Sequence, residues 1–353
     1  MSQSGREIRA IVVDDSVLMR QLIKQLLESD PEIEVVATAM DPYVAREKIK
    51  AYKPDVITLD IEMPRMDGLT FLKNLMRLHP IPTVMISTLT EKGARETMRA
   101  LELGAFDAIA KPTSDVEKGL EAAAEHIINV VKAAARTKVH LLAPRAHGSH
   151  DEEHEAGKPD ENSPRSQQVV AIGASTGGTE AIKAVLRDLD PKMPGIVIAQ
   201  HIPPVFSASF AERMHQCTPF NVCEARDGMP IQDGHVYVAP GGRHLDVKKN
   251  GSGYLCRVHD SDPVNRHRPS VDVLFESVSR NVGSDAFGVI LTGMGADGAR
   301  GLKEMRDAGA PTIAQNEETS VVWGMPGSAV KQGAAEHVLP LNEIASKIRS
   351  TFS

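Results

Sequence analysis

The stretch that decides the fold of the second half of the chain is VVAIGASTGG, residues 169–178. Four apolar residues at 169–172 predict a buried strand, and the apolar positions that follow Thr179 recur at helical spacing. Ser175 lies in the glycine-rich turn between them, which is typical of a nucleophile elbow, G-x-S-x-G. A phosphate-binding glycine turn at the start of a helix has the same pattern. The motif alone leaves both interpretations open.

The composition of the 353-residue chain is that of a globular protein. Hydrophobic residues make up 41% and charged residues 25%, and no apolar run approaches the ~20 residues of a membrane span. The formal net charge is −7, and neither half has the basic excess that binding to phosphate backbones requires. We therefore expect about two domains, no nucleic acid partner and no direct membrane insertion.

Cysteine usage and the first residues predict a cytoplasmic location. Cys217, Cys223 and Cys256 show no CxxC spacing, and such an odd, sparse set is typical of a reducing compartment. The N-terminal residues lead directly into an expected strand and contain no apolar segment of a signal peptide.

Residues 1–135 alternate apolar runs with amphipathic segments, which predicts an α/β domain with a doubly wound parallel sheet. The clearest helices are expected at 17–27 and 69–78. The five expected strands are residues 8–13, 33–39, 56–59, 83–86 and 108–110.

Reactive side chains follow four of these strands: Asp14 and Asp15, Asp60, Ser87, and Lys111. Three carboxylates that meet at one sheet edge repel one another unless a hard cation such as Mg²⁺ binds them. Asp60 then becomes the acceptor of a phosphoryl group, and Lys111 holds the phosphoryl oxygens as a point charge. Acidic residues that simply face solvent are the alternative, which the convergence of the whole set disfavours.

Four motifs of this region are distinctive: VVDDS (12–16), DIEMPRMDGL (60–69), ISTLT (86–90) and AKP (110–112). With these motifs, the region is similar to response-regulator receiver domains over its full length. The resemblance implies a flavodoxin-like fold, phosphorylation of Asp60 by a histidine kinase, and Mg²⁺ at Asp14, Asp15 and Asp60. It also implies that Lys111 binds the phosphoryl group and that Ser87 is the hydroxyl that follows it.

Residues 136–168 predict a flexible polar linker, because they show no periodicity and almost nothing that could be buried. His147, His150 and His154 within it are potential metal ligands. A disordered tract supplies no further groups to hold such ligands in place, so a chance spacing is the preferred interpretation. The predicted domains are therefore 1–135 and 169–353.

Two further buried strands, at 196–199 and 287–291, lead into His201 and into the loop that contains Asp297. Because carboxyl ends of parallel strands share one sheet edge, these residues are expected to meet Ser175. A neighbouring imidazole makes a serine hydroxyl nucleophilic, and a buried carboxylate fixes the imidazole tautomer. A lone histidine after a strand is more often structural, but the combination favours a Ser-His-Asp hydrolase.

A dinucleotide-binding site is an alternative. Gly293, Gly295 and Gly298 form a literal G-x-G-x-x-G between an expected strand and helix, and Glu317 or Glu318 has the spacing of the ribose-binding acid. Too few residues follow for the second half of a dinucleotide-binding fold. A signalling module that binds partners without catalysis is a third possibility.

The second half of the chain contains eight distinctive motifs: IGASTGG (172–178), AQHIPPVFSASFAERM (199–214), EARDGMPI (224–231), VYVAPGGRH (236–244), DPVNRHRPSVDVLF (262–275), GVILTGMGADGARGL (288–302), TIAQNEE (312–318) and GMP (324–326). With these motifs, residues 169–345 resemble the catalytic domain of chemotaxis methylesterases, the CheB family. The resemblance implies a Rossmann-like α/β domain that hydrolyses glutamate γ-methyl esters and deamidates glutamines on methyl-accepting chemotaxis receptors, with no cofactor in this domain. A chemotaxis histidine kinase is the implied phosphodonor.

The same resemblance implies the roles of four residues. Ser175 is the nucleophile, His201 the base and Asp297 the residue that orients it, while the backbone N–H of Met294 contributes to the oxyanion hole.

Three residues depart from the family patterns. Ala108 stands where receivers often carry an aromatic switch residue, Asn316 where the methylesterases usually have aspartate, and Gly327 where an arginine commonly follows GMP. An aromatic rotamer switch is therefore not expected, and the other two changes bear on receptor contacts.

Overall fold

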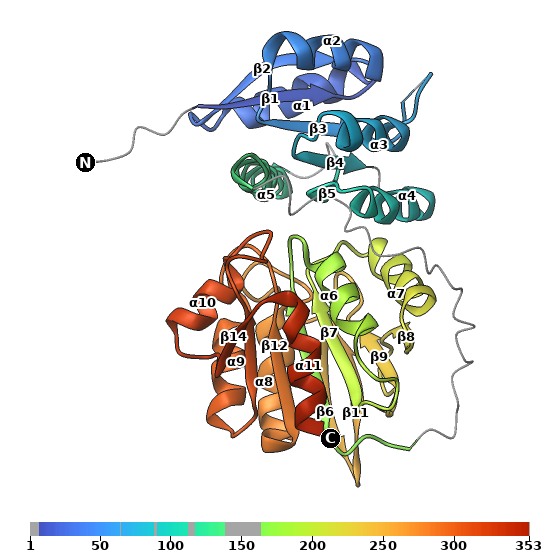
Figure 1. Ribbon diagram of the computed structural model, residues 1–353, viewed down its shortest axis with the longest axis vertical. Coiled ribbons are helices and arrows are strands. Elements are labelled where there is room, and N and C mark those ends of the chain that lie inside the picture. The colour runs from blue at the N-terminus through green and yellow to red at the C-terminus, as the bar shows by residue number, and fades with distance from the viewer. Residues whose placement is uncertain (1–6, 64, 88–89, 112–116, 138–163, 353) are drawn as a thin grey trace. The chain divides into compact units, whose positions relative to one another are not determined.

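We describe a computed structural model of the chain, which defines residues 7–63, 65–87, 90–111, 117–137 and 164–352. The chain divides into two compact units, residues 1–146 and 147–353 (Figure 1). The segment 138–163, with His147, His150 and His154, lies outside the described residues.

The first unit contains a five-stranded parallel sheet of order β2-β1-β3-β4-β5, the flavodoxin-like order. The predicted fold of this region is therefore confirmed, and the strand bounds differ from the expected ones by one residue at most. Its elements are β1 (Ile8–Val13), α1 (Val17–Glu28), β2 (Ile33–Ala39), α2 (Pro42–Tyr52), β3 (Val56–Asp60), α3 (Gly68–Leu78), β4 (Thr83–Ser87), α4 (Glu91–Glu102), β5 (Asp107–Ala110) and α5 (Glu117–Arg136).

Four helices of this unit begin at the carboxyl edge of the sheet with a capping side chain. Ser16, Asp41, Asp67 and Thr90 each accept a hydrogen bond from a backbone N–H in the first turn of α1, α2, α3 and α4, respectively. Such caps satisfy amide groups that a helix leaves unpaired at its start. They fix where each strand-to-helix loop ends, and thereby the positions of the loop residues before them.

The second unit contains a seven-stranded sheet of order β14-β13-β12-β6-β7-β9-β8, and all its strand pairs are parallel. A separate antiparallel hairpin, β10–β11, accompanies it. The elements are β6 (Val169–Ala174), α6 (Gly178–Arg187), β7 (Gly195–Gln200), α7 (Phe206–Cys217), β8 (Asn221–Glu224), β9 (His235–Val238), β10 (His244–Asn250), β11 (Gly253–His259), α8 (Val271–Asn281), a 3₁₀ turn (Gly283–Asp285), β12 (Ala286–Ile290), α9 (Ala299–Asp307), β13 (Thr312–Gln315), α10 (Met325–Lys331), β14 (His337–Leu339) and α11 (Leu341–Phe352).

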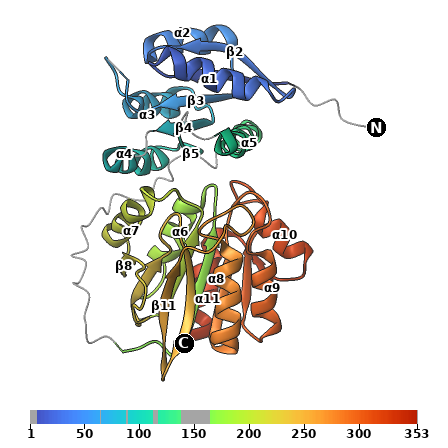
Figure 2. The ribbon, with the colours of Figure 1, turned by 180° about the vertical axis from the view of Figure 1, so that it is seen from behind.

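Helices cover both faces of this second sheet. Helices α6, α7 and α11 lie on one face, and α8, α9 and α10 lie on the other (Figures 1 and 2). The hairpin β10–β11 packs against α8 and extends the core on that side. The three central strands β6, β7 and β12 are completely buried, so they read as continuous apolar runs in the sequence.

The chain leaves β6 toward β7 on one side and later returns to pair β12 on the other side of β6. Ligands of doubly wound folds bind at such a reversal, outside the carboxyl ends of the strands. This is the edge at which Ser175, His201 and Asp297 follow their strands.

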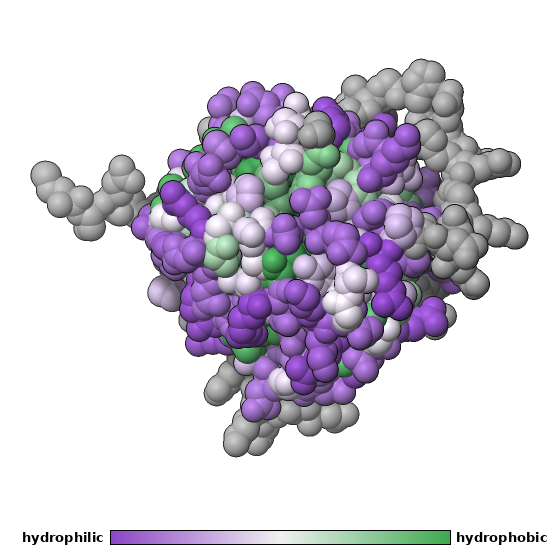
Figure 3. Space-filling view, turned by 90° about the horizontal axis from the view of Figure 1, so that it is seen from below, coloured by the Kyte–Doolittle hydropathy of each residue, from purple (hydrophilic) through white to green (hydrophobic). Residues whose placement is uncertain are grey.

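Figure 3 shows the molecule from below as mostly hydrophilic, with only small separate apolar areas on the face in view.

No helix in the described part of the chain is both long enough and apolar enough to cross a membrane.

Candidate active site and phosphoacceptor site

The three central strands of the second sheet bring Ser175, His201 and Asp297 together. Ser175 directly follows β6, and His201 directly follows β7, its neighbour. Asp297 belongs to the loop between β12 and α9, on the other side of β6. The structure thus places in one contact network the three side chains that the strand-end rule groups together.

The imidazole of His201 bridges the other two side chains. Its Nδ1 lies 3.1 Å from the Ser175 hydroxyl, and its Nε2 lies 2.7 Å from Asp297 Oδ2. A carboxylate only accepts hydrogen bonds, so we assign the ring proton to Nε2 and leave Nδ1 free to accept from the serine. This arrangement matches a Ser-His-Asp triad, except that Nδ1 rather than Nε2 of the histidine faces the nucleophile.

Asp297 is 3% exposed and accepts hydrogen bonds from five donors. Burial disfavours its charge, but hydrogen bonds from His201, Asn265 and the backbone lower its pKa well below the usual range of aspartate. The carboxylate also lies at the start of α8, where backbone amides favour negative charge. The donors and their distances are His201 Nε2 (2.7 Å), Val271 N (2.7 Å), Asn265 Nδ2 (2.6 Å), Ser270 Oγ (2.8 Å) and Asp272 N (3.2 Å).

Ser175 is half-buried in a turn that neighbouring segments hold in place. Its backbone N–H donates to Thr292 O (3.0 Å), and its carbonyl accepts from Gln200 Nε2 (2.9 Å). The left-handed residue of the turn is Gly177, with φ of 75°, and a Cβ there would lie 2.7 Å from Val321. Ser175 itself has no positive φ, so the strained serine of the elbow motif is not found here, although strand, turn and helix follow as predicted.

The loop after β12 lies directly against the serine. A Cβ on Gly293 would lie 2.8 Å from Ser175 Cβ, so only glycine permits this approach. Within the described part of the chain, the N–H of the next residue, Met294, has no hydrogen-bond acceptor. The oxyanion role predicted for this N–H is thus compatible with its hydrogen bonding.

The same loop disfavours the dinucleotide interpretation. Gly293 and Gly298 do lie between β12 and α9 as the fingerprint requires. However, Gly293 N donates to Val322 O, and Gly293 O accepts from the N–H groups of Gly324 and Met325. A pyrophosphate needs close access to this backbone. Here the chain itself occupies that place, and Asp297 points into the triad.

Sequence reasoning assigned no role to Asn265, His267 and Ser270, which all contact the triad. Asn265 and Ser270 donate to Asp297, and the His267 ring stacks on His201 with centroids 3.6 Å apart. A helix cap at Ser270 is detectable from its position before an amphipathic run. Which distant carboxylate that cap meets depends on the tertiary fold and has no local signal.

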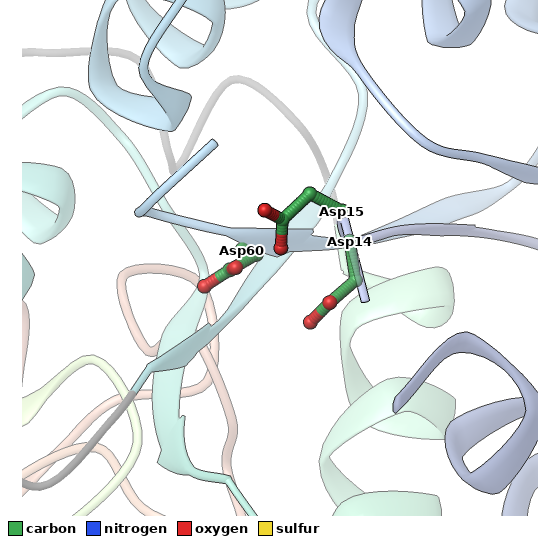
Figure 4. Close-up of side chains that lie close together, drawn as sticks. All are labelled: Asp14, Asp15 and Asp60. Atoms are coloured by element: carbon green, nitrogen blue, oxygen red, sulfur yellow. The ribbon is translucent and has the colours of Figure 1, made fainter. Parts of the chain in front are cut away.

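The first unit brings Asp14, Asp15 and Asp60 together at the carboxyl edge of its sheet (Figure 4). Carboxylate oxygens of the three residues lie within 4.8 Å of one another. Lys111 Nζ lies 2.8 Å from Asp60 Oδ2 and 2.9 Å from Asp14 Oδ2. Ser87, at the end of β4, is buried, and its carbonyl accepts from the N–H of Lys111. All five sequence-predicted residues are therefore neighbours.

Burial and the neighbouring charges shift the pKa values of Asp60 and Lys111. Burial raises the pKa of Asp60 to about 6, with a contribution from the nearby Asp14 carboxylate that the Lys111 ammonium partly offsets. Burial alone would lower the pKa of Lys111, but its contacts with Asp60 and Asp14 raise it. Three carboxylates with one lysine leave an excess of negative charge that suits a divalent cation with oxygen ligands.

The three residues that depart from the family patterns lie in different local surroundings. Ala108 is half-buried on β5. Asn316 Oδ1 accepts from the N–H and hydroxyl of Thr319, bonds that an aspartate would also accept. Gly327, on α10, lies against Trp323, where a Cβ would be 3.1 Å from the ring. The three cysteines are free.

Comparison with known proteins agrees with this organisation. The model of the CheB methylesterase family matches residues 170–348, and that of the response regulator receiver domain matches residues 10–124. A curated relative from Hydrogenovibrio crunogenus, named protein-glutamate methylesterase/protein-glutamine glutaminase, is 52% identical over 97% of this chain and 98% of its own. One from Hahella chejuensis, with the same name and the number 1, is 53% identical over 100% of this chain and 98% of its own.

A solved structure supports the fold of the second unit. The crystal structure of the Thermotoga maritima CheB methylesterase catalytic domain is 37% identical, with a TM-score of 0.51. It covers 52% of this chain and 98% of that chain. With relatives that match over nearly the full length and a triad at the predicted edge, the chain belongs to the family of CheB-type protein-glutamate methylesterases/protein-glutamine glutaminases that carry a receiver domain.

Proposed function

We propose that the protein removes methyl groups from glutamate γ-methyl esters of methyl-accepting chemotaxis receptors, and deamidates receptor glutamines, in the cytoplasm. The observation that carries this proposal is the continuous contact from the Ser175 hydroxyl through His201 to the buried Asp297 carboxylate. The curated relatives carry both activities in their names. The family resemblance supplies the receptor as substrate.

The reaction follows from the contacts. Ser175 Oγ attacks the ester carbonyl while His201 Nδ1 takes its proton, and the Asp297 carboxylate stabilises the imidazolium that results. The N–H of Met294 stabilises the tetrahedral oxyanion. The proton on Nδ1 then passes to the departing methanol, or to ammonia when the substrate is a glutamine. Water, activated by His201, hydrolyses the acyl-enzyme and returns Ser175 and a glutamate carboxylate.

A covalent inhibitor tests whether the serine is reactive. An organophosphorus fluoride is expected to label only the peptide that contains Ser175 and to remove esterase activity in proportion to labelling. A domain that binds receptors without catalysis has no activated serine. Labelling elsewhere with activity retained, or no labelling of Ser175 in an active enzyme, would contradict the proposed role.

The receiver region supplies the regulation in this proposal. A chemotaxis histidine kinase is the phosphodonor, and Asp60 is the phosphoacceptor. Asp14, Asp15 and Asp60 would hold Mg²⁺, which when bound neutralises the charge of the incoming phosphoryl group. Lys111 holds phosphoryl oxygens, and Ser87 donates to one of them. The clustered carboxylates and the adjacent lysine support this assignment.

Phosphorylation is proposed to relieve inhibition of the methylesterase domain by the receiver. The linker keeps the two domains at high effective concentration, so even a weak contact between them is sufficient to cover the serine. A phosphoryl group adds roughly −1.5 to −2 charge at Asp60 and biases the receiver toward another conformation. Tenfold relief requires a bias of only ~1.4 kcal/mol, within the usual range of coupling free energies.

The Asp60→Asn variant is expected to keep basal activity and to lose all stimulation by a small phosphodonor with Mg²⁺. The amide cannot form an aspartyl phosphate, whereas the triad is unaffected. Methanol release with and without phosphodonor measures both quantities. Stimulation that persists in Asp60→Asn would assign phosphorylation to another residue.

A fragment that begins at Pro164 is expected to be faster than the unphosphorylated full-length enzyme and to ignore the phosphodonor. The start precedes Ser166, whose buried hydroxyl accepts from the N–H of Gly195 and donates to Asp233. Cutting after Ser166 would therefore damage the fold. A fragment no faster than the unphosphorylated enzyme would exclude occlusion, and the receiver would then have to activate the site or recruit the receptor.

A further inference from the structure

A two-residue turn approaches the triad from the loop between β11 and α8. Val264 and His267 pair across it, with N–H to carbonyl distances of 3.1 and 2.9 Å in the two directions. The central residues Asn265 and Arg266 have φ of 52° and 67°. Two successive positive φ values define a type I′ turn, in which asparagine is favoured at the first central position. We call residues 264–267 the triad turn.

The first contact of the triad turn is with the carboxylate of the triad. Asn265 Nδ2 lies 2.6 Å from Asp297 Oδ1 and 2.8 Å from Asp272 Oδ2. Both carboxylates are 3% exposed, whereas Asn265 is exposed. The carboxylates only accept, so the amide nitrogen must face them, and its two hydrogens serve one carboxylate each. Asn265 thus lies between the solvent and both buried carboxylates.

The second contact is with the base. The His267 ring is stacked on the His201 ring, with centroids 3.6 Å apart and planes inclined by 11°. The two ring nitrogens of His201 make its bonds to Ser175 and Asp297. Rotation of the ring about its Cβ–Cγ bond would carry both nitrogens away from these partners. A ring packed on one face opposes that rotation without competing for either nitrogen.

We propose that the triad turn positions both catalytic partners of the serine, with Asn265 acting on Asp297 and His267 acting on His201. They are positioning residues, because the contacts described above join them to Asp297 and His201 and not to Ser175. This inference rests on the proposed esterase function, since it concerns the same triad. Left-handed φ values at non-glycine residues cost free energy and persist where the surroundings fix them, as these contacts do here.

The proposal predicts a specific pattern for His267. His267→Ala should lower kcat roughly tenfold or more with little change in KM, because the substrate still binds but His201 is no longer held in the attacking orientation. His267→Phe restores a flat ring without nitrogen atoms and should recover most of that loss. Rescue by phenylalanine separates face packing from any proton transfer by His267.

The variants that test Asn265 must preserve the backbone conformation of the triad turn. Asn265→Gly adopts positive φ without strain and removes the side chain with its amide, so kcat should fall roughly tenfold while the melting temperature stays near that of the wild type. Asn265→Asp keeps the shape but sets a third carboxylate against Asp272 and Asp297. We expect it to lose more activity than the glycine variant.

The matched control is His235→Ala. It also removes an imidazole next to an aromatic ring, that of Tyr237, but lies at the start of β9, away from the triad. Its kcat should equal that of the wild type. All variants are made in the full chain and assayed by methanol release, with Ser175→Ala as the inactive reference.

Two outcomes separate the failure of this inference from the failure of the proposed function. A wild type that releases no methanol contradicts the function itself. An active wild type accompanied by His267→Ala and Asn265→Gly at full kcat contradicts the positioning role alone. Equal losses in His267→Ala and His267→Phe would also contradict it, because the ring face would then not be what matters.

Discussion

Ser175→Ala is expected to lower receptor demethylation by roughly 10³-fold or more while leaving the fold intact. The hydroxyl group is all that the substitution removes. Without it, His201 has no nucleophile from which to take a proton. Mass spectrometry of receptor peptides measures the rate at each ester and each glutamine separately. Both reactions should fall together, because both pass through the same acyl-enzyme.

Ser279→Ala is the matched control for this change. Its hydroxyl donates to Glu304 O from the half-buried face of α8 and has no contact with the triad. It should retain the wild-type rate. Demethylation by Ser175→Ala within tenfold of the wild type would show that another group is the nucleophile.

Asp297→Asn is expected to reduce kcat by roughly 10³-fold, through the tautomer of His201. An amide nitrogen that faces Nε2 would require Nε2 to accept, so the ring proton would move to Nδ1, where it blocks the serine. Turning the asparagine amide over does not remove this conflict, because every hydrogen bond to Asp297 comes from a donor. An amide hydrogen must therefore meet a donor in either orientation, and some loss of stability is expected as well.

Thermal unfolding separates the two effects of Asp297→Asn. The loss of kcat should persist at temperatures where the variant is fully folded. Asp246→Asn, on β10 and outside the triad, controls for the loss of a half-buried carboxylate and should be active. A folded Asp297→Asn variant with near wild-type kcat would show that Asp297 does not set the tautomer.

Buried strands were predictable because both sheets are parallel and covered on both faces. Strands such as β6 and β12 are then continuous apolar runs, and the carboxyl ends of the strands gather the reactive residues. That rule alone was sufficient to predict the grouping of Ser175 with His201 and Asp297. It worked because Ser175 and His201 directly follow their strands, and Asp297 lies in the loop that β12 leads into.

The shorter strands and the support of the triad were not predictable in this way. The edge strands β8 and β14 are three or four residues long and only partly buried, so they have no clear apolar run. The contacts of Asn265 and His267 link residues far apart in sequence. Which nitrogen of His201 faces the serine depends on side-chain orientation, for which the sequence has no signal.

Methanol release from methylated receptor membranes tests the account most directly, with the wild type and Ser175→Ala assayed with and without a small phosphodonor plus Mg²⁺. We predict that the wild type releases methanol, that phosphodonor increases its rate, and that Ser175→Ala is slower by roughly 10³-fold or more under either condition. Release by Ser175→Ala at a rate near that of the wild type, or no release by the phosphorylated wild type, would contradict a phosphorylation-activated serine esterase.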